Sequence, residues 1–194
     1  MIRLALIRHG HTAWNRAGRI QGRTDIPLDP DAARHLATLA LPAPWNTAAL
    51  VSSPLRRAVE TAELISGKTP VSLPALIEMD WGVWEGKKGR DLLASSGSGY
   101  RHIEDWGWAY RPPGGESPAD VRARLQPWLA SLGTDTVAVC HIGIMRVLMA
   151  DATRWDFDGP APFRIKRDRL FVLEMTEGGL RVAGEPIRLE ARTA

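Results

Sequence analysis

Two histidines far apart in the sequence are the first candidates for chemistry. His9 lies in the segment LIRHGHTAWN, between Arg8 and Gly10, where a short apolar run ends, and His141 also follows an apolar run. Glycine gives the backbone freedom and leaves room for a ligand beside the first imidazole. A neutral imidazole is a competent nucleophile, and a neighbouring arginine disfavours its protonation. Taken alone, however, His9 is more simply explained as a strand-end residue that hydrogen-bonds a loop.

The residues that follow His9 could bind an anion. Thr12 can cap the next helix, whose N-terminal amides would then face a negative charge. Asn15 adds a side-chain donor, and Arg8 adds a fixed positive charge. These groups together predict an anionic ligand beside His9.

Two further arginines lie in the segment SSPLRRAVETA, residues 52–62. Arg56 and Arg57 fall in the first turns of a predicted helix, where the helix dipole does not favour cations. Arginine is also the side chain best suited to bidentate phosphate binding. An arginine at this place makes sense if it neutralises an anion. The alternative is an ordinary solvated arginine, and we favour that interpretation for Arg56.

Three carboxylates lie among large apolar residues in PALIEMDWGVWEG, residues 74–86. They are Glu78, Asp80 and Glu85. An apolar setting tends to raise the pKa of a carboxyl group, and a raised pKa suits a general acid. The alternative for each is a carboxylate on a surface turn.

A metal site is a competing hypothesis. His9 and His11 have a spacing that metal ligands use, and with His141 and an acid they could hold zinc. Two histidines one residue apart also occur often by chance. Cys140 precedes His141, but adjacent strand residues face opposite sides of a sheet. Cys140 is therefore expected to be a core residue and not a ligand.

The elements that carry these residues alternate between strand and helix. Short apolar runs predict buried strands over residues 2–7, 49–52 and 136–140, and the first and last end at the two histidines. Alternation of this kind favours an α/β sheet with helices on both faces. Ligands bind beyond the carboxyl ends of such strands. We therefore expect His9 and His141 to meet in one place.

Four helices are expected between and after these strands. Helical spacing or start signals predict them over residues 31–41, 53–66 and 143–150, and from Ser117-Pro118 onward. Ser53 is expected to be an N-cap with Pro54 as the first helical residue. Asp120 stands at a capping-box position, and Pro127 should kink its helix or end the first half. The tail over residues 163–189 reads as one or two strands with a turn at Gly178-Gly179.

Residues 87–116 show no clear period and are predicted to be a lid insertion. Their aromatic side chains could stack on a leaving group or simply pack within the lid; these are Tyr100, Trp106, Trp108 and Tyr110. Arg101 and Arg111 could bind a second anionic group or be solvated.

Composition bounds the class of protein. The chain has 194 residues, of which 44% are hydrophobic and 24% charged, which is typical of one globular domain with a buried core. A single cysteine excludes a disulfide scaffold and fits a reducing compartment. No apolar run approaches the roughly 20 residues that span a bilayer, and the N-terminal run is too short for a signal peptide. We expect a cytoplasmic protein.

Charge does not indicate nucleic-acid binding. The net charge is +3 and the pI about 9.4. Only four of the 25 basic residues are lysines, however, and the arginines are spread along the chain. We expect neither nucleic acid nor membrane as a partner. The eight tryptophans could serve the core or a homodimer interface.

Five ordered segments carry a family resemblance over nearly the whole chain. They are RHGxT with Asn15, SPLxRAxxTA, PxLxExxxGxWEG, PGGES (residues 113–117) and VCHxG. In this order they resemble the histidine phosphatase superfamily, which has the phosphoglycerate-mutase-like fold. GRIQGRTDIPL (residues 18–28) and PGGES are most similar to bacterial small-molecule phosphatases of the α-ribazole phosphatase type.

The resemblance implies a single domain, an α/β/α sandwich with a mostly parallel six-stranded sheet. It implies no metal, no cofactor and a phosphohistidine intermediate. His9 matches the nucleophile, and Glu78 matches the acid that protonates the leaving oxygen. The remaining matches are phosphate-binding or substrate-binding positions: Arg8, Arg57, His141, Asn15 and Gln21.

Two positions depart from the family pattern. His11 stands where relatives usually have Glu or Gln, and it could change contacts at the mouth of the pocket. Ile142 stands where many relatives have the glycine after the second histidine. It puts in doubt any amide contact that requires a glycine there.

The predicted function is hydrolysis of a small phosphorylated metabolite, with α-ribazole 5'-phosphate as one candidate. A phosphoglycerate mutase is the alternative, because the same His9 chemistry serves both reactions. Less favoured hypotheses are a non-catalytic phosphate-binding protein and a metallohydrolase.

Overall fold

The computed structural model describes residues 1–192 and is built on one central sheet. The strands are β1 (Ile2–Arg8), β3 (Ala49–Ser52), β4 (Val71–Ser72), β5 (Thr136–Cys140), β6 (Arg169–Thr176), β7 (Gly179–Val182) and β8 (Ile187–Arg188). They lie in the order β4-β3-β5-β1-β6-β7, with β8 paired to β6. The strands from β4 to β1 are parallel, whereas β6 pairs antiparallel with β1, β7 and β8. A separate two-stranded sheet joins β2 (Leu39–Ala40) to β9 (Glu190–Ala191).

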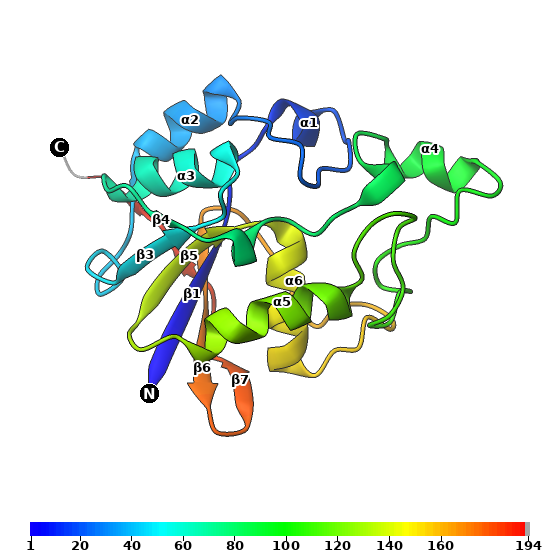
Figure 1. Cartoon of the computed structure of the whole chain (residues 1–194). Helices are drawn as coiled ribbons and strands as arrows, with labels where there is room; N and C mark the ends of the chain where they lie inside the picture. The colour runs from blue at the N-terminus through cyan, green and yellow to red at the C-terminus, as the bar shows by residue number, and fades with distance from the viewer. Residues whose placement is uncertain (193–194) are drawn as a thin grey trace.

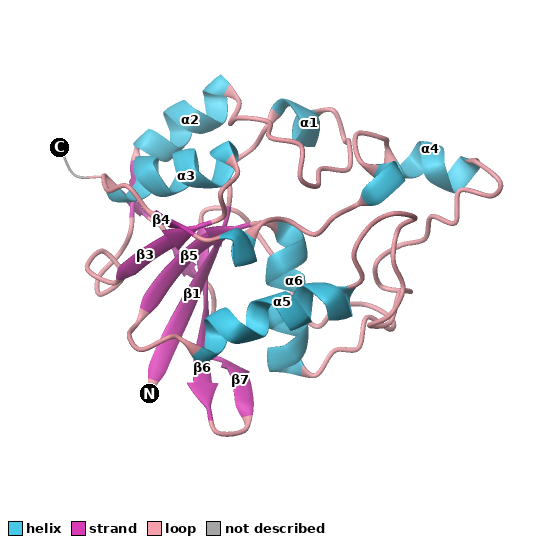
Figure 2. Ribbon diagram, viewed as in Figure 1, coloured by secondary structure: helices cyan, strands magenta, loops and turns pink. Residues whose placement is uncertain are grey.

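Helices cover both faces of the sheet (Figures 1 and 2). The α-helices are α1 (Ala13–Arg16), α2 (Pro30–Ala37), α3 (Arg56–Ser66), α4 (Gly89–Ala94), α5 (Pro118–Ala130) and α6 (Ile142–Thr153). Two 3-10 turns, η1 (Pro74–Leu76) and η2 (Gly82–Trp84), lie between β4 and α4. α2 and α3 lie on one face of the sheet, and α5 and α6 lie on the other (Figure 1). The predicted α/β/α sandwich is confirmed.

The alternation of side chains along each strand produces this layering. In β1, Leu4 and Leu6 pack into the core cluster that includes α5 and α6, whereas Ala5 and Ile7 pack into the cluster that includes α2 and α3. β5 and β6 divide their residues between the two clusters in the same way. Because both faces are buried, the central strands are continuous apolar runs and not alternating ones. No helix among the described residues is long and apolar enough to cross a membrane.

Several predicted boundaries are wrong for local reasons. α2 ends at Ala37 and not at residue 41, because Leu39 and Ala40 pair with β9. α3 begins at Arg56 without a side-chain cap, so Ser53 is not its N-cap. α6 extends the helix predicted over residues 143–150 at both ends.

The C-terminal half follows its predictions more closely. α5 has the expected capping box between Ser117 and Asp120, and it continues through Pro127 to Ala130. The hairpin turn is formed by residues 177–178, and Gly179 already belongs to β7.

The segment 87–116 contains α4 and an irregular chain that extends away from the sheet (Figure 2). It packs through edge-on and tilted aromatic contacts centred on Trp84 and Trp106. Five of the eight tryptophans are buried, and the other three are partly buried. The five buried tryptophans therefore serve the interior of this chain.

Candidate active site

The topology brings His9 and His141 together. β1 and β5 are parallel neighbours in which Arg8 is aligned with Cys140, so both histidines leave the sheet at the same edge. The amide of His9 donates to the carbonyl of Cys140 at 3.0 Å. The two ring centroids are 5.0 Å apart. The sequence prediction that His9 and His141 meet in one place is confirmed.

The backbone sets the tautomer of His9. Its Nδ1 lies 2.6 Å from the carbonyl oxygen of Gly10, and a carbonyl can only accept, so Nδ1 carries the proton. Nε2 therefore keeps its lone pair. The side chain is buried, and burial, together with the charges of Arg57 and Arg8, holds the pKa of His9 well below its ordinary 6.5. His9 is thus a neutral nucleophile at physiological pH.

His141 is held by a residue whose role the sequence did not reveal. Its Nε2 lies 2.6 Å from the hydroxyl of Ser53, which also accepts from the amide of Leu55. The other nitrogen, Nδ1, is buried and has no partner within residues 1–192. Burial and the nearby His9 lower the pKa of His141 well below 6.5. Ser53 therefore orients the second imidazole, and the predicted capping role is replaced by this contact.

The side chains of Arg8 and Arg57 both lie near the two histidines. Arg57 is fully buried, and its terminal nitrogens donate to the carbonyls of Thr24 and Gly22 at 2.9 and 2.6 Å. Its Nε and that of Arg8 are buried without partners in the described chain. Burial, followed by the charge of Arg167, lowers the pKa of Arg8 to about 9. Both guanidinium groups remain charged at neutral pH.

Arg56 separates from its neighbour. Its side chain is exposed and pairs with Glu60 one turn along α3 at 3.2 Å. The interpretation of Arg56 as a solvated helix arginine is confirmed. Only one of the two adjacent arginines is therefore available to an anion in the site.

Glu78 is the buried carboxyl group of the site. One oxygen accepts from the amide of Met79 at 2.7 Å and the other from that of Gly143 at 3.2 Å. Burial raises the pKa of Glu78 above its ordinary 4.5, although these hydrogen bonds and the charge of Arg57 oppose the rise. A raised pKa favours the protonated form that a general acid needs.

The glycine that matters follows Ile142. A Cβ on Gly143 would stand 2.3 Å from Oε1 of Glu78, so the carboxyl group would have to shift. The present position of this carboxyl group therefore depends on glycine at 143, and the contact uses the amide of that residue and not that of residue 142. The doubt raised by the Ile142 departure does not apply.

Asp80 and Glu85 have structural partners instead. Asp80 accepts from the amide of Gly82 at 2.8 Å and lies 3.5 Å from Arg23. Glu85 accepts from the amides of Gly22 and Thr24. These bonds fix the loop 22–24, whose carbonyls hold Arg57. Of the three predicted acids, Glu78 alone is buried beside His9 and His141.

A chain of hydrogen bonds orients Gln21. The oxygen of Asn15 accepts from Arg167 at 3.1 Å and from the amide of Thr12 at 3.2 Å, so its amino group must be the one that faces Gln21 Oε1. The amino group of Gln21 is then left buried without a partner in residues 1–192. Thr12 closes the capping box with Asn15 and donates to Gln21 at 3.1 Å. Thr12 therefore supports Asn15 and Gln21 and does not itself line the cavity.

Two arginines near the site were not predicted. Arg167 donates through Nε to the carbonyl of His9 at 3.0 Å, and burial lowers its pKa to about 10. Arg146, on the second turn of α6, makes no ion pair among the described residues, and its charge acts on Arg8 and Glu78. A lone cation in the apolar run IGIMRVLMA was a signal for Arg146. Arg167 lies in a basic run and gave none.

These groups surround a small cavity of about 150 Å³. Arg8, His9, Asn15, Gln21 and Glu78 are among the residues that line it. Arg8 and Gln21, which line this cavity, each have a buried nitrogen without a partner among the described residues, and such a group is suited to contact a ligand. Two arginines and one carboxyl group line it, so the cavity is suited to an anion.

The metal alternative gains no support. No group of three or more histidine, cysteine, aspartate or glutamate side chains in the part of the chain that the structure describes could hold a metal ion. Cys140 is buried, and burial raises the pKa of its thiol, which disfavours a thiolate ligand. His11 is only partly buried, and its Nδ1 has no partner among residues 1–192.

The aromatic residues of the segment 87–116 do not reach the cavity. Trp106 is buried against Trp81 and Trp84, and Trp108 donates to Asp156 at 2.8 Å. Arg101 stacks on Tyr110 at 3.5 Å from the ring centroid. Tyr100 contacts Trp84, and Arg111 pairs with Asp120. Of the two interpretations left open, packing is the one that these contacts support.

Comparison with known proteins agrees with the family resemblance of the sequence. A profile of the histidine phosphatase superfamily (branch 1) matches residues 4–185. The chain belongs to this superfamily. As a histidine phosphatase it is an enzyme of the phosphatase type.

Relatives and solved structures agree with this membership. Glucosyl-3-phosphoglycerate phosphatase of Mycolicibacterium vanbaalenii is 34% identical over 166 residues, covering 76% of this chain and 72% of that protein. A probable phosphoglycerate mutase of Yersinia pestis is 33% identical over 136 residues, covering 68% and 63%. Bacillus stearothermophilus YhfR superposes with a TM-score of 0.81 at 28% identity, over 95% and 96% of the two chains. TTHB049 from Thermus thermophilus gives 0.76 at 29%, over 100% and 99%. These relatives support the superfamily but not the narrower resemblance to α-ribazole phosphatases.

Proposed function

We propose that this histidine phosphatase is a metal-independent phosphomonoesterase that acts on a small phosphorylated metabolite through a phosphohistidine. One observation carries the proposal. Nε2 of His9 keeps a free lone pair, and the structure buries four further nitrogens without a partner in residues 1–192, on Arg8, Gln21, Arg57 and His141. A phosphoryl group would satisfy them and would place phosphorus in front of the nucleophile.

In the first step Nε2 of His9 attacks phosphorus as the ester P–O bond breaks. Phosphoryl transfer spreads charge over the equatorial oxygens, so positioning and electrostatics supply most of the rate. Arg8, Arg57 and His141 offer donors to those oxygens. Glu78 gives its proton to the leaving oxygen, which departs as the free alcohol.

In the second step water hydrolyses the phosphohistidine. The ionised Glu78 takes a proton from water as its oxygen bonds to phosphorus and the N–P bond breaks. Orthophosphate leaves, and both His9 and Glu78 return to their starting protonation states. The hydrogen bond from Nδ1 to Gly10 keeps the imidazole in one orientation through both steps.

The substrate is proposed only as a class. A cavity of about 150 Å³ holds a phosphoryl group and little more, so the leaving group must extend beyond it. Arg19, Trp81 and Ile142 also line this cavity. A panel of phosphorylated metabolites ranks the candidates by kcat/KM. It includes glucosyl-3-phosphoglycerate and 3-phosphoglycerate, after the names of the relatives. It also includes α-ribazole 5'-phosphate, after the GRIQGRTDIPL and PGGES segments.

The His9→Ala variant tests the assignment on 4-nitrophenyl phosphate. We expect a loss of about 10⁴-fold or more in kcat, because the variant has no nucleophile. His35→Ala is the matched control, since His35 is exposed on α2. Exhaustive chelation should leave wild-type activity unchanged. Near-wild-type turnover by His9→Ala, or loss of activity on chelation, would contradict the proposal.

The mutase alternative rests on relatives and solved structures that bear that name. Phosphorus NMR with 3-phosphoglycerate and bisphosphoglycerate decides between the two reactions. Accumulation of orthophosphate supports the phosphatase, whereas 2-phosphoglycerate would establish the mutase. A non-catalytic phosphate-binding protein would give neither product and no trapped phosphohistidine.

A further inference from the structure

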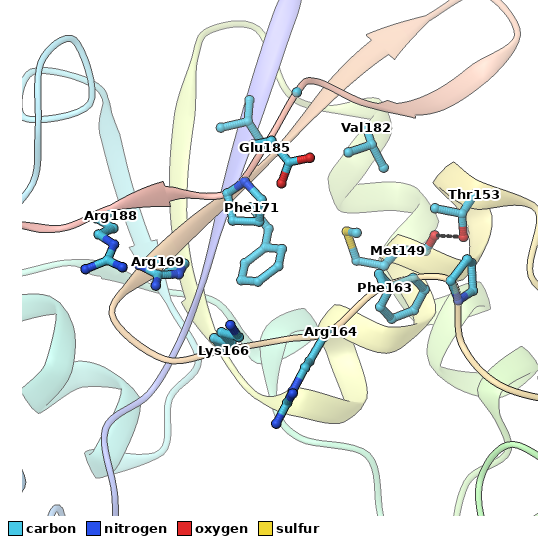
Figure 3. A pocket seen from close by; sticks show the side chains of 14 residues that line it. Met149, Thr153, Phe163, Arg164, Lys166, Arg169, Phe171, Val182, Glu185 and Arg188 are labelled. Carbon is cyan, nitrogen blue, oxygen red and sulfur yellow. Dashed lines mark hydrogen bonds between the residues drawn. The ribbon is translucent and has the colours of Figure 1, made fainter.

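A second and larger cavity lies apart from the one beside His9. It has a volume of about 600 Å³, which is within the range of small-molecule sites. It lies between the C-terminal half of α6, the loop 162–168 and the strands β6, β7 and β8 (Figure 3). It shares no lining residue with the cavity beside His9.

The middle of this cavity is apolar. Met149 and Phe171 are buried core residues whose side chains form its floor, and Phe163 stands beside them (Figure 3). Phe163 is braced edge-on by Trp155 at a centroid distance of 5.5 Å. An aromatic or aliphatic group placed here would bury apolar surface on a rigid support.

The rim of the cavity carries four cations. Arg164 and Lys166 come from the loop, whereas Arg169 and Arg188 stand side by side at one end (Figure 3). Within residues 1–192 none of the four side chains makes an ion pair or a hydrogen bond to a protein group. Glu185 is the one acidic residue among those that line the cavity.

Arg169 and Arg188 are moreover in an unfavourable arrangement. They are direct partners in the antiparallel register of β6 and β8, so their side chains share one face of the sheet. Like charges opposite each other destabilise a strand pair. An anion between them would convert this repulsion into two attractive contacts.

We propose that this cavity is a second ligand site, which takes a small organic anion with an aromatic or aliphatic body. The cations bind the anionic group, a carboxylate, sulfonate or phosphate ester. The floor at Met149, Phe163 and Phe171 takes the apolar body. Charge complementarity selects such a ligand over a neutral one, and the apolar floor selects it over inorganic phosphate.

The fluorescent anion 8-anilinonaphthalene-1-sulfonate tests the site, because it combines a sulfonate with an aromatic body. We expect one saturable site per chain by fluorescence and calorimetry. N-phenyl-1-naphthylamine, which lacks the sulfonate, should bind at least tenfold more weakly. The site should persist in His9→Ala and in wild-type protein saturated with orthovanadate, which keeps this test independent of the proposed reaction.

Substitutions at the rim locate the binding. The double variant Arg169→Gln/Arg188→Gln should weaken binding of the sulfonate about tenfold. Because it removes a like-charge pair, the thermal midpoint of the ligand-free protein should be unchanged or higher. Arg164→Gln/Lys166→Gln, in the exposed loop, should weaken binding similarly. Arg56→Gln/Arg90→Gln removes the same charge from exposed positions on α3 and α4, neither of which lines this cavity, and is the matched control.

Three results would overturn the proposal. The first is equal affinity of both rim variants and the control for the sulfonate. The second is displacement of the probe by orthovanadate, which would place it beside His9. The third is that the protein sediments as a dimer, and that the rim substitutions both dissociate this dimer and restore probe binding. A second copy of the chain would then be the occupant of this face.

Discussion

Replacing Gly143 by alanine is the sharpest test of how Glu78 is held. The new Cβ would stand 2.3 Å from Oε1 and 3.1 Å from the carboxyl carbon of Glu78, and 3.1 Å from Cβ of Met79. Real Cβ contacts are essentially never closer than 3.0 Å. The carboxyl group must therefore retreat by about 0.7 Å or more, away from the Gly143 amide. The rest of the site has no reason to move.

The size of the effect follows from this displacement. A misplacement of about 1 Å in a catalytic group costs on the order of 10²-fold in rate, which equals about 2.7 kcal/mol of activation free energy. The loss should fall on the step in which Glu78 gives its proton to the leaving oxygen. Esters of alkyl alcohols, which need that proton, should lose about 100-fold in kcat/KM. For 4-nitrophenyl phosphate, whose leaving group departs unprotonated, the loss should stay below about tenfold.

The assay compares both substrates in Gly143→Ala and in Gly133→Ala. A Cβ on Gly133 meets nothing within 4 Å, so this control makes the same chemical change at a harmless place. Orthovanadate affinity and the near-ultraviolet circular dichroism should be unchanged in both variants. Full activity of Gly143→Ala on alkyl esters would refute the role given to Glu78. An equal loss of kcat/KM on both substrates would show that the substitution did not act through proton donation by Glu78.

Two further predictions concern pH. The lowered pKa of His9 should keep wild-type kcat/KM on alkyl esters high well below pH 6.5. The raised pKa of Glu78 means that kcat/KM should fall as pH rises through that pKa and Glu78 loses its proton. The Glu78→Gln variant, measured on the same esters, should lack this alkaline decline. Because the neutral form of His141 is favoured only in the folded protein, the unfolded chain takes up a proton below pH 6.5 that the folded chain does not. As pH falls from about 6.5 to 5.5, the wild type should therefore lose up to about 1.4 kcal/mol of unfolding free energy per pH unit relative to His141→Gln. Urea titrations measure this difference. A difference that does not change with pH would contradict the burial assigned to His141.

Several residues of the site could be predicted from the sequence because each stands at a strong local signal. His9 and His141 end apolar runs, and parallel strands bring such ends to one edge of a sheet. Arg57 stands where the helix dipole disfavours a cation, and the structure buries it completely. For Arg57 an unfavourable local position indicated an anion, whereas for the two histidines it was the strand topology that placed them together.

The contacts that orient these residues could not be predicted, since they join segments far apart in sequence. Ser53 carries a helix-cap pattern, yet its hydroxyl contacts His141, 88 residues away. Arg167 reaches the carbonyl of His9 across 158 residues. Local patterns describe what a residue does to its own segment. They contain no information on which distant segment will approach it.

Burial is the common cause of the chemistry proposed here. It acts in opposite directions on two groups, because it disfavours whichever form is charged. His9 is a base when neutral and Glu78 is an acid when neutral, so one low-dielectric site keeps both in the form that the first step needs. The same burial keeps water away from the guanidinium groups of Arg8 and Arg57, which strengthens their attraction for a phosphoryl dianion. A substitution that admitted water without removing any of these four residues should therefore slow the reaction through all of them at once.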